Sequence, residues 1–294
     1  MENLIEKFLG FLQNEKKLTK NTLESYKRDI NNFIQFLNEK ELTVINCEND
    51  AINDYIKKLE GEAKTPSTIS RHIASLRSFY QYLYDNRLVK NNPTKGVETP
   101  KIVRKEPAIL SNTQVELLLE QPKSVDLKGI RDKAMLELVY ATGIRVTELI
   151  NLDINDIDFE NACVRCVGPH NKERIIPIGN IAIKALKDYI ENARNYLIKT
   201  ESTKSLFVNI SGKRLTRQGF WKIIKYYQEQ ANIDVDITPH TLRHSFAVHL
   251  LENGADIDVI QEMLGHTDKT STQVYAAMTQ NRLKDIYNKT HPRA

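Results

Sequence analysis

The sequence predicts a mainly α-helical protein in two parts: an all-α N-terminal domain and an α-rich C-terminal domain with a small antiparallel β-sheet. Three observations support this fold class. Apolar residues recur at helical spacing along most of the chain. A stretch rich in proline, asparagine and basic residues interrupts that spacing over residues 89–106. Only two short runs, 163–167 and 174–178, have strand character, and a turn separates them.

The N-terminal domain is expected over residues 1–88, with four helices. Residues 2–14 and 22–38 carry apolar side chains at helical period, and 51–59 is a shorter helix of the same kind. A fourth helix is expected to begin at Thr65-Pro66-Ser67, because proline is favoured in the first turn of a helix. Residues 89–106 then predict a basic interdomain linker.

The C-terminal domain is expected over residues 107–294. Leu110-Ser111-Asn112-Thr113 resembles a helix cap, and Gly143 ends a strong helix that starts at Ile130. The two strand-like runs are expected to pair around the turn that they enclose. Further helices are predicted over residues 182–197, 216–230, 239–252 and 256–264, and Gly254 and Gly265 are expected to end the last two.

Composition limits the classes of function. The chain has 294 residues and no apolar run of membrane-spanning length, and its start lacks the pattern of a signal peptide, so we expect a cytoplasmic protein. Three cysteines are too few for a disulfide framework. Cys163 and Cys166 match C-x-x-C, but strand geometry would place their side chains on opposite faces.

Positive charge is concentrated in two segments. The net charge is only +4, yet residues 64–105 hold nine Lys/Arg and two acids, and residues 202–228 hold six Lys/Arg and no acid. Such clusters are typical of polyanion binding, although an isolated basic run is more often a solvated surface. The candidate DNA contacts are Arg71, Arg77, Lys101, Arg104, Lys105, Arg214 and Arg217.

The strongest functional pattern lies near the C-terminus. His240 and Arg243 are three residues apart and so share a helix face; His266 and Tyr275 follow. A guanidinium clamps phosphate oxygens, imidazoles move protons near neutral pH, and a phenol oxygen can be a nucleophile. Together these groups suit chemistry on a phosphodiester. Taken singly, each has a plainer interpretation, as a surface salt bridge, a helix-end histidine or a core tyrosine.

Two upstream motifs complete the pattern. Arg145 follows Gly143 at a helix start, and Lys172 lies in Gly168-Pro169-His170-Asn171-Lys172-Glu173-Arg174. The order Arg, Lys, His-x-x-Arg, His, Tyr closely resembles the tyrosine recombinase (phage integrase) family, and in particular its bacterial Xer-type subgroup. The segments 216–221, 251–256 and 291–294 are also similar to that subgroup. Relatives usually carry Gly-Lys-Gly where this chain has Gly168-Pro169-His170.

The resemblance implies a residue-by-residue assignment. Arg145 and Arg243 would bind the scissile phosphate, with Glu148 orienting Arg145, and Tyr275 would attack phosphorus. Lys172 would protonate the departing 5′ oxygen. His240 would hydrogen-bond a non-bridging oxygen, and His266 would hydrogen-bond the reacting oxygens or assist proton transfer. Nearby cations are expected to lower the pKa of the phenol.

The resemblance also implies a SAM-like core-binding N-terminal domain, a 3′-phosphotyrosine intermediate and strand exchange through a Holliday junction. The implied partners are a duplex with a dif-like site, a homo- or heterotetramer with a second Xer-type recombinase, and an FtsK-like translocase. The role would be resolution of chromosome dimers at the nucleoid. No cofactor, metal or ATP is expected, since no P-loop or convincing ligand set is present.

Three alternatives remain at this level. The chain could be the integrase or resolvase of a mobile element, although it starts directly with the core-binding helices. A type IB topoisomerase shares the phosphotyrosine step but acts as a monomer without site preference. A non-catalytic DNA-binding protein would have lost part of the site, whereas all six catalytic positions are present here.

Overall fold

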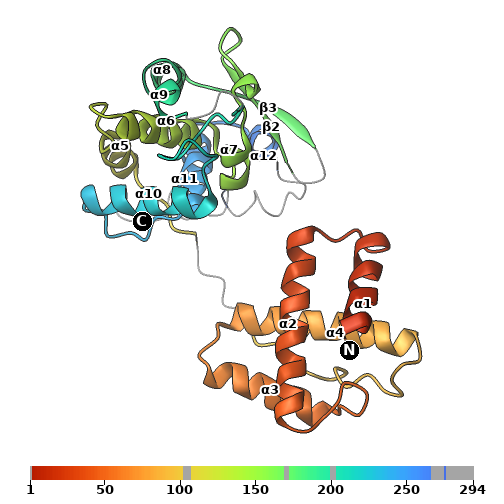
Figure 1. The fold of residues 1–294 in the computed structure, drawn as a ribbon. Coiled ribbons are helices and arrows are strands. Elements are labelled where there is room, and N and C mark those ends of the chain that lie inside the picture. The colour runs from red at the N-terminus through yellow and green to blue at the C-terminus, as the bar shows by residue number, and fades with distance from the viewer. Residues whose placement is uncertain (1, 102–106, 169–171, 199–202, 266–274, 276–294) are drawn as a thin grey trace, which may run out of the picture. The chain divides into compact units, whose positions relative to one another are not determined.

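The computed structural model describes residues 2–101, 107–168, 172–198, 203–265 and 275. The chain separates into two compact units, Met1–Lys105 and Glu106–Ala294. The described elements are mostly helices, with one small antiparallel sheet in the second unit (Figure 1). The predicted fold class is therefore confirmed. No helix among the described residues is long and apolar enough to cross a bilayer.

Four helices form the first unit: α1 (Glu2–Asn14), α2 (Lys20–Glu39), α3 (Asn49–Gly61) and α4 (Pro66–Asp85). Helix α1 runs beside α2, and α4 packs across α2 (Figure 1). Aromatic rings fill the core; Phe8 of α1 meets Phe79 of α4 with ring centroids 5.2 Å apart. Thr65 caps α4 by accepting the backbone N–H of Thr68, as the Thr-Pro start predicts.

The first part of the expected linker packs against this unit. Val89 and Val97 are buried in its core. The Asn49 side-chain amide donates to the carbonyl oxygens of Pro93 and Lys95. The Arg77 guanidinium donates to the Val97 carbonyl oxygen and to the Thr99 hydroxyl. These bonds fix the segment as far as residue 99, so it continues the helical unit beyond residue 88.

The second unit is built around α6 (Leu127–Thr142), whose side chains are buried on nearly every face. Helices α8 (Asn180–Tyr189) and α11 (Pro239–Glu252) pack against it. The sheet has the order β1-β2-β3 (Ile157–Asp158, Cys163–Val167 and Glu173–Pro177), with β2 and β3 antiparallel and Val164 opposite Ile176. The other α-helices among the described residues are α5 (Asn112–Glu120), α7 (Val146–Asn151), α9 (Asn195–Leu197), α10 (Arg217–Gln230) and α12 (Ile257–Leu264).

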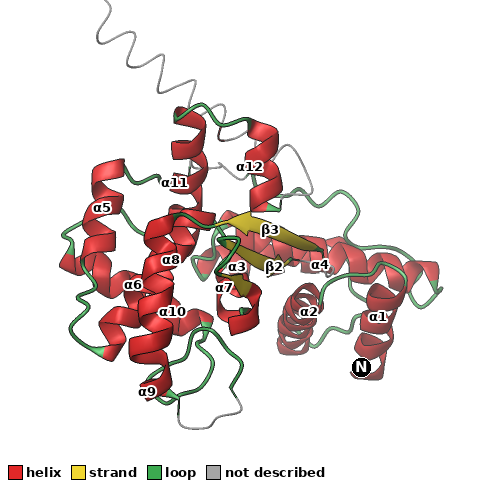
Figure 2. Cartoon of the chain, turned by 90° about the horizontal axis from the view of Figure 1, so that it is seen from above, coloured by secondary structure: helices red, strands yellow, loops and turns green. Residues whose placement is uncertain are grey.

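Two glycines end helices as predicted. Gly143 follows α6 and Gly265 follows α12, both in the left-handed conformation with φ of 59° and 62°. A Cβ atom on Gly143 would lie 2.4 Å from the Phe246 ring, so this position also sets how closely α6 approaches α11. Helix α12 lies beside β3 (Figure 2). The ends of α6 and α12 and the body of α11 therefore meet.

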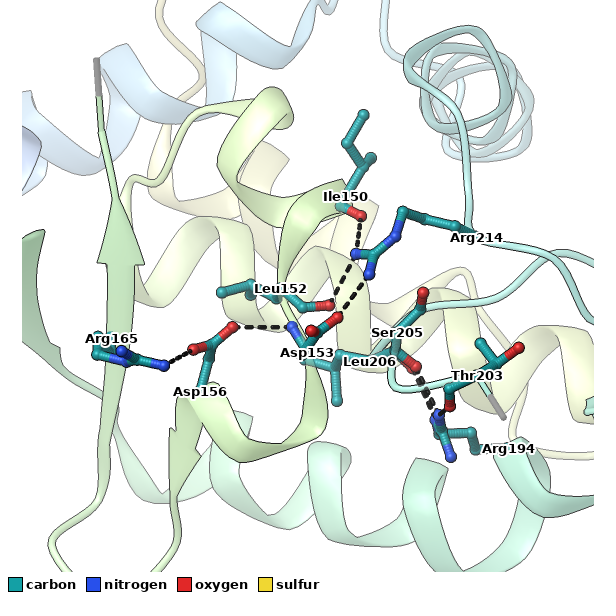
Figure 3. A network of polar contacts seen from close by, with 10 residues as sticks. All are labelled: Ile150, Leu152, Asp153, Asp156, Arg165, Arg194, Thr203, Ser205, Leu206 and Arg214. Atoms are coloured by element: carbon teal, nitrogen blue, oxygen red, sulfur yellow. Dashed lines mark hydrogen bonds and ion pairs between the residues drawn. The ribbon is translucent and has the colours of Figure 1, made fainter. Parts of the chain in front are cut away.

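The helix predicted over residues 182–197 is interrupted. A π-helical turn, Ile190–Arg194, joins α8 to α9. Within it Arg194 is buried and donates to the carbonyl oxygens of Thr203, Ser205 and Leu206 (Figure 3). The turn thus places a guanidinium where it satisfies a buried loop, which apolar periodicity alone does not reveal.

Arg194 generates a stability prediction. In Arg194→Met the carbonyl oxygens that it satisfies would lose their donors in a buried site, so we expect the free energy of unfolding to fall by about 2–4 kcal/mol. Urea denaturation measures this change. The control is Arg165→Met: Arg165 is half exposed and its ion pair with Asp156 lies at the surface, so a loss within about 1 kcal/mol is expected. Equal losses in the two variants would contradict the assignment.

Candidate active site

An open cleft of about 1020 Å³ lies in the second unit. Its wall is formed by the starts of α7, α10 and α11. Arg145 precedes α7, Arg217 begins α10, and His240 and Arg243 lie in the first turns of α11. Three of the six predicted catalytic residues, Arg145, His240 and Arg243, thus line one cavity, together with the candidate DNA contacts Arg214 and Arg217.

The carbonyl end of α12 gathers three guanidinium groups. Arg174 donates through Nε to the Met263 oxygen at 2.7 Å, and Arg243 through Nη2 to the Leu264 oxygen at 2.6 Å. Arg145 donates through Nη2 to the Gly265 oxygen at 3.1 Å. The last carbonyls of a helix lack intrahelical partners and carry the negative end of its dipole. Three cations from separate elements therefore converge on one anchor.

Gly265 makes this approach possible. A Cβ atom at Gly265 would lie 3.1 Å from the Arg174 guanidinium carbon, and the backbone there is left-handed. Arg243 is also tied to α6, since its Nη1 donates to the Gly143 oxygen. Its side chain is 3% exposed, and burial, with the charge of Arg145, lowers its pKa to about 10. Arg243 remains a cation at neutral pH.

Glu148 is the carboxylate that balances this charge. Its Oε2 accepts the Arg145 backbone N–H at 2.7 Å, and its Oε1 accepts Arg145 Nη1 at 3.1 Å and Arg174 Nη1 at 2.7 Å. Burial alone would raise its pKa, but the hydrogen bonds from Arg174 and Arg145 prevail and lower it. Glu148 is therefore ionised and accepts hydrogen bonds from both the backbone and the guanidinium of Arg145; that it orients Arg145 for a reaction stays a prediction.

Tyr275 reaches this centre from outside the cleft lining. Its side chain is 2% exposed, and its Oη lies 2.8 Å from Nδ1 of His244. Burial raises the pKa of the phenol, while the charges of Arg243 and Arg145 act in the opposite direction. The expectation that nearby cations would lower this pKa was wrong for the net shift, because desolvation outweighs the arginines.

The histidines of α11 differ in their surroundings. His240 lies at the cleft, and desolvation there, followed by the charges of Arg243 and Arg217, lowers its pKa. The His244 ring lies 6.2 Å from that of His240, and burial, with His240 and Arg243, lowers its pKa to about 4. Both imidazoles are therefore neutral at physiological pH and can accept or relay hydrogen bonds.

The remaining predicted site residues are less constrained. Lys172 is exposed just before β3, and its carbonyl accepts the Gly168 N–H at 2.8 Å, which closes the base of the β2–β3 hairpin. Pro169, His170 and His266 lie outside the described residues, as do Arg104 and Lys105. The roles predicted for Lys172 and His266 stay predictions.

Several candidate DNA contacts have internal partners. In the first unit Arg71 pairs with the buried Asp29, and Arg77 donates to Val97 and Thr99. In the second, Arg214 donates to the Ile150 and Leu152 carbonyls and to Asp153 (Figure 3). Arg217 and Lys101 are exposed. The internal bonds orient these side chains, and contact with DNA stays a prediction for all of them.

Two residues with clear positions in the site were not predicted. Arg174 joins the carbonyl end of α12 to Glu148, and His244 bonds the phenol of Tyr275. The available signals were weak: Arg174 is two residues from Lys172 on a strand, and His244 follows Arg243 directly. For neither residue does the sequence indicate which distant group its side chain contacts.

Comparisons with known proteins agree with these motifs. The sequence pattern of the phage integrase family matches residues 108–282, and that of the phage integrase N-terminal SAM-like domain matches residues 5–87. The chain is 49% identical to tyrosine recombinase XerD of Oceanobacillus iheyensis, covering 100% of both chains, and 45% identical to that of Halalkalibacterium halodurans, covering 100% of this chain and 99% of the relative.

Among solved structures, the fold is similar to that of the XerH site-specific recombinase, crystallised with a palindromic difH substrate in a post-cleavage complex. The TM-score is 0.77 at 21% identity, covering 96% of this chain and 82% of that chain. This likeness concerns the fold, and the two XerD relatives carry the comparison of sequence.

Glu148 generates a prediction with a pH signature. In Glu148→Gln the buried Arg174 loses its anionic partner, so we expect the free energy of unfolding to fall by about 2–4 kcal/mol near neutral pH. Because the folded-state pKa of Glu148 lies below its ordinary value of 4.5, its contribution is present above that pH and is lost as the pH falls through the folded-state pKa. The difference between wild type and variant should therefore shrink on acidification.

Urea unfolding at about pH 7 and about pH 3 measures this difference. The matched control is Glu173→Gln, since Glu173 is exposed and pairs with Arg165 only at the surface; a change within about 0.5 kcal/mol is expected at both pH values. A Glu148→Gln deficit that does not depend on pH would show that the carboxylate charge is not what stabilises the cluster.

Proposed function

The chain belongs to the phage integrase family of tyrosine recombinases, and from this premise we propose how its residues cut and rejoin DNA. Members of this family are enzymes that exchange DNA strands through a tyrosine nucleophile. The observation that carries the assignment to particular residues is the convergence of Arg145, Arg243 and Tyr275 around the carbonyl end of α12 and the start of α11.

Arg145 and Arg243 clamp the scissile phosphate. Backbone carbonyl groups and Glu148 hold the two guanidinium groups in position. Little reorganisation of these side chains is therefore needed when an anion binds. Arg145 uses two of its five N–H donors on Glu148 and Gly265 and is partly exposed in the cleft. His240, at the same cleft, hydrogen-bonds a non-bridging oxygen of the phosphate. His266 hydrogen-bonds the reacting oxygens.

The reaction conserves bond energy. Tyr275 Oη forms a bond to phosphorus while the bond from phosphorus to the 5′ oxygen breaks, which leaves a 3′-phosphotyrosine and a 5′ hydroxyl. Lys172 gives a proton to the departing oxygen. A 5′ hydroxyl from the partner duplex then attacks the phosphotyrosine and releases the phenol. Each strand exchange is thus balanced without ATP or another cofactor.

The full-length similarity to XerD proteins supports a proposal for the substrate and partners. We propose a duplex with a dif-like site, a homo- or heterotetramer with a second Xer-type recombinase, and exchange through a Holliday junction. Resolution of chromosome dimers, control by an FtsK-like translocase and a place in the cytoplasm at the nucleoid belong to the same proposal. The fold shared with a recombinase crystallised on difH supports the choice of site.

Tyr275 is tested by covalent trapping. With a target duplex nicked so that cleavage cannot be reversed, the wild-type protein should form an SDS-resistant protein–DNA adduct. Tyr275→Phe lacks the nucleophilic oxygen and should form none, while its affinity in a gel-shift assay stays within about twofold of wild type, because the hydroxyl is buried. An adduct in Tyr275→Phe would move the nucleophile elsewhere, and absence of any adduct in wild type would favour a DNA-binding protein.

The proposed role of Lys172 is tested by changing the leaving group of the DNA. Lys172→Ala should slow cleavage by about 10²–10⁴-fold, because the 5′ oxygen departs without a proton donor. A substrate with sulfur in place of that bridging oxygen needs no protonation, so the variant should cleave it at close to the wild-type rate. Lys184→Ala, at an exposed lysine of α8 that lies outside both basic segments and is not predicted for the site, is the control. Equal slowing of Lys172→Ala on both substrates would exclude a general-acid role.

A further inference from the structure

His244 has no part in the mechanism described above, yet it touches the reacting atom. It follows Arg243 on α11, and its Nδ1 lies 2.8 Å from Tyr275 Oη, with ring centroids 5.5 Å apart. The residue is partly buried, and the phenol is almost completely so. A phenol proton that is shielded from water needs an acceptor within the protein.

We propose that Nδ1 of His244 accepts the phenolic proton of Tyr275 when the phosphotyrosine forms and returns it when the DNA is rejoined. This inference rests on the proposed role of Tyr275 as nucleophile. In cleavage the O–H bond of Tyr275 breaks as the bond to phosphorus forms, and the proton moves to Nδ1, which gives an imidazolium. In rejoining the imidazolium protonates the departing phenol oxygen, and the neutral ring is restored.

The protonation states fit this role. An acceptor must be neutral, and the pKa of His244 is lowered to about 4 by burial and by His240 and Arg243, so the ring is free of a second proton at neutral pH. With Nδ1 as the acceptor, the ring carries its proton on Nε2. The pKa of Tyr275 is raised by burial, so the phenol enters the reaction protonated. The pair is therefore O–H···N before attack.

An arriving phosphate strengthens the acceptor. The charged and titratable groups facing this pair are His240 and Arg243 of the same helix and Arg145 at the start of α7. The positive charge of Arg243 disfavours an imidazolium at His244. A phosphate bound to the two arginines offsets that charge, so proton transfer becomes easier only when the substrate is in place. The resting enzyme therefore keeps a neutral phenol.

A second histidine of α11, His249, forms a similar bond with Tyr140 of α6, and neither residue has a part in the proposed reaction. His249 Nδ1 lies 2.9 Å from the Tyr140 hydroxyl, and its Nε2 bonds the Leu110 carbonyl oxygen. Acidic residues, Glu116 and Glu137, are the charges that act on Tyr140 after burial. The His249–Tyr140 bond thus resembles the His244–Tyr275 bond in geometry but not in charge environment, which makes His249 the control.

The test compares His244→Gln with His249→Gln by single-turnover adduct formation across pH. Glutamine can still accept a hydrogen bond from the phenol but cannot take its proton. For His244→Gln we expect a loss of about 10²–10³-fold near neutral pH and a rate that rises roughly tenfold per pH unit, because the phenol must ionise to solvent. Wild type and His249→Gln should lack that slope. DNA affinity and thermal unfolding confirm that the variants bind and fold.

A second measurement separates proton acceptance from positioning. Replacing Tyr275 by 3,5-difluorotyrosine lowers the phenol pKa, which should restore His244→Gln by at least about tenfold and change the wild-type histidine background by less than about threefold. A His244→Gln enzyme with the wild-type rate, or with a loss that is uniform in pH and unaffected by fluorination, would overturn the proposal. If Tyr275→Phe still forms adducts, the proposed nucleophile fails instead.

Discussion

The structure of the site depends on the carbonyl groups at the end of α12, which have no hydrogen-bond partner within the helix and accept from arginine side chains instead. Three guanidinium groups from β3, α11 and the residue before α7 are held there side by side, although like charges repel. The negative end of the helix dipole and the Glu148 carboxylate offset that repulsion. Without this anchor, the guanidinium groups of Arg145 and Arg243 would share no fixed partner, and an anion bound by both would have to order them itself.

The anchor also connects Arg145 to the hairpin that carries Lys172, the residue proposed as general acid. Arg174 bridges Glu148 and the end of α12, and it is only two residues from Lys172 at the base of the β2–β3 hairpin. Strand β3 begins at Glu173, directly after Lys172, and its second residue, Arg174, is bonded to the same carboxylate that bonds Arg145. A shift of β3 would displace Arg145 as well, because Arg174 and Arg145 both bond the Oε1 atom of Glu148.

Local signals predicted most of the fold. The capping residues Thr65 and Ser111 and the terminal glycines Gly143 and Gly265 begin or end helices as expected, because those preferences act within one turn. The predicted order of the catalytic residues came from a resemblance and not from physical pattern. Contacts between distant segments could not be predicted from the sequence. The π-helical turn at Arg194 is an example, because the carbonyl groups to which Arg194 donates belong to a separate loop.

Desolvation changes what the site means chemically. On sequence alone, cations beside a phenol imply an activated nucleophile. In the folded chain burial outweighs Arg145 and Arg243, so the phenol of Tyr275 is less acidic than usual. Glu148 offsets only part of the charge of the three guanidinium groups, and the phenol of Tyr275 stays protonated. In the reaction proposed above, a scissile phosphate would bring further negative charge and the electrophile to this cluster together, so that binding and activation would be one electrostatic event.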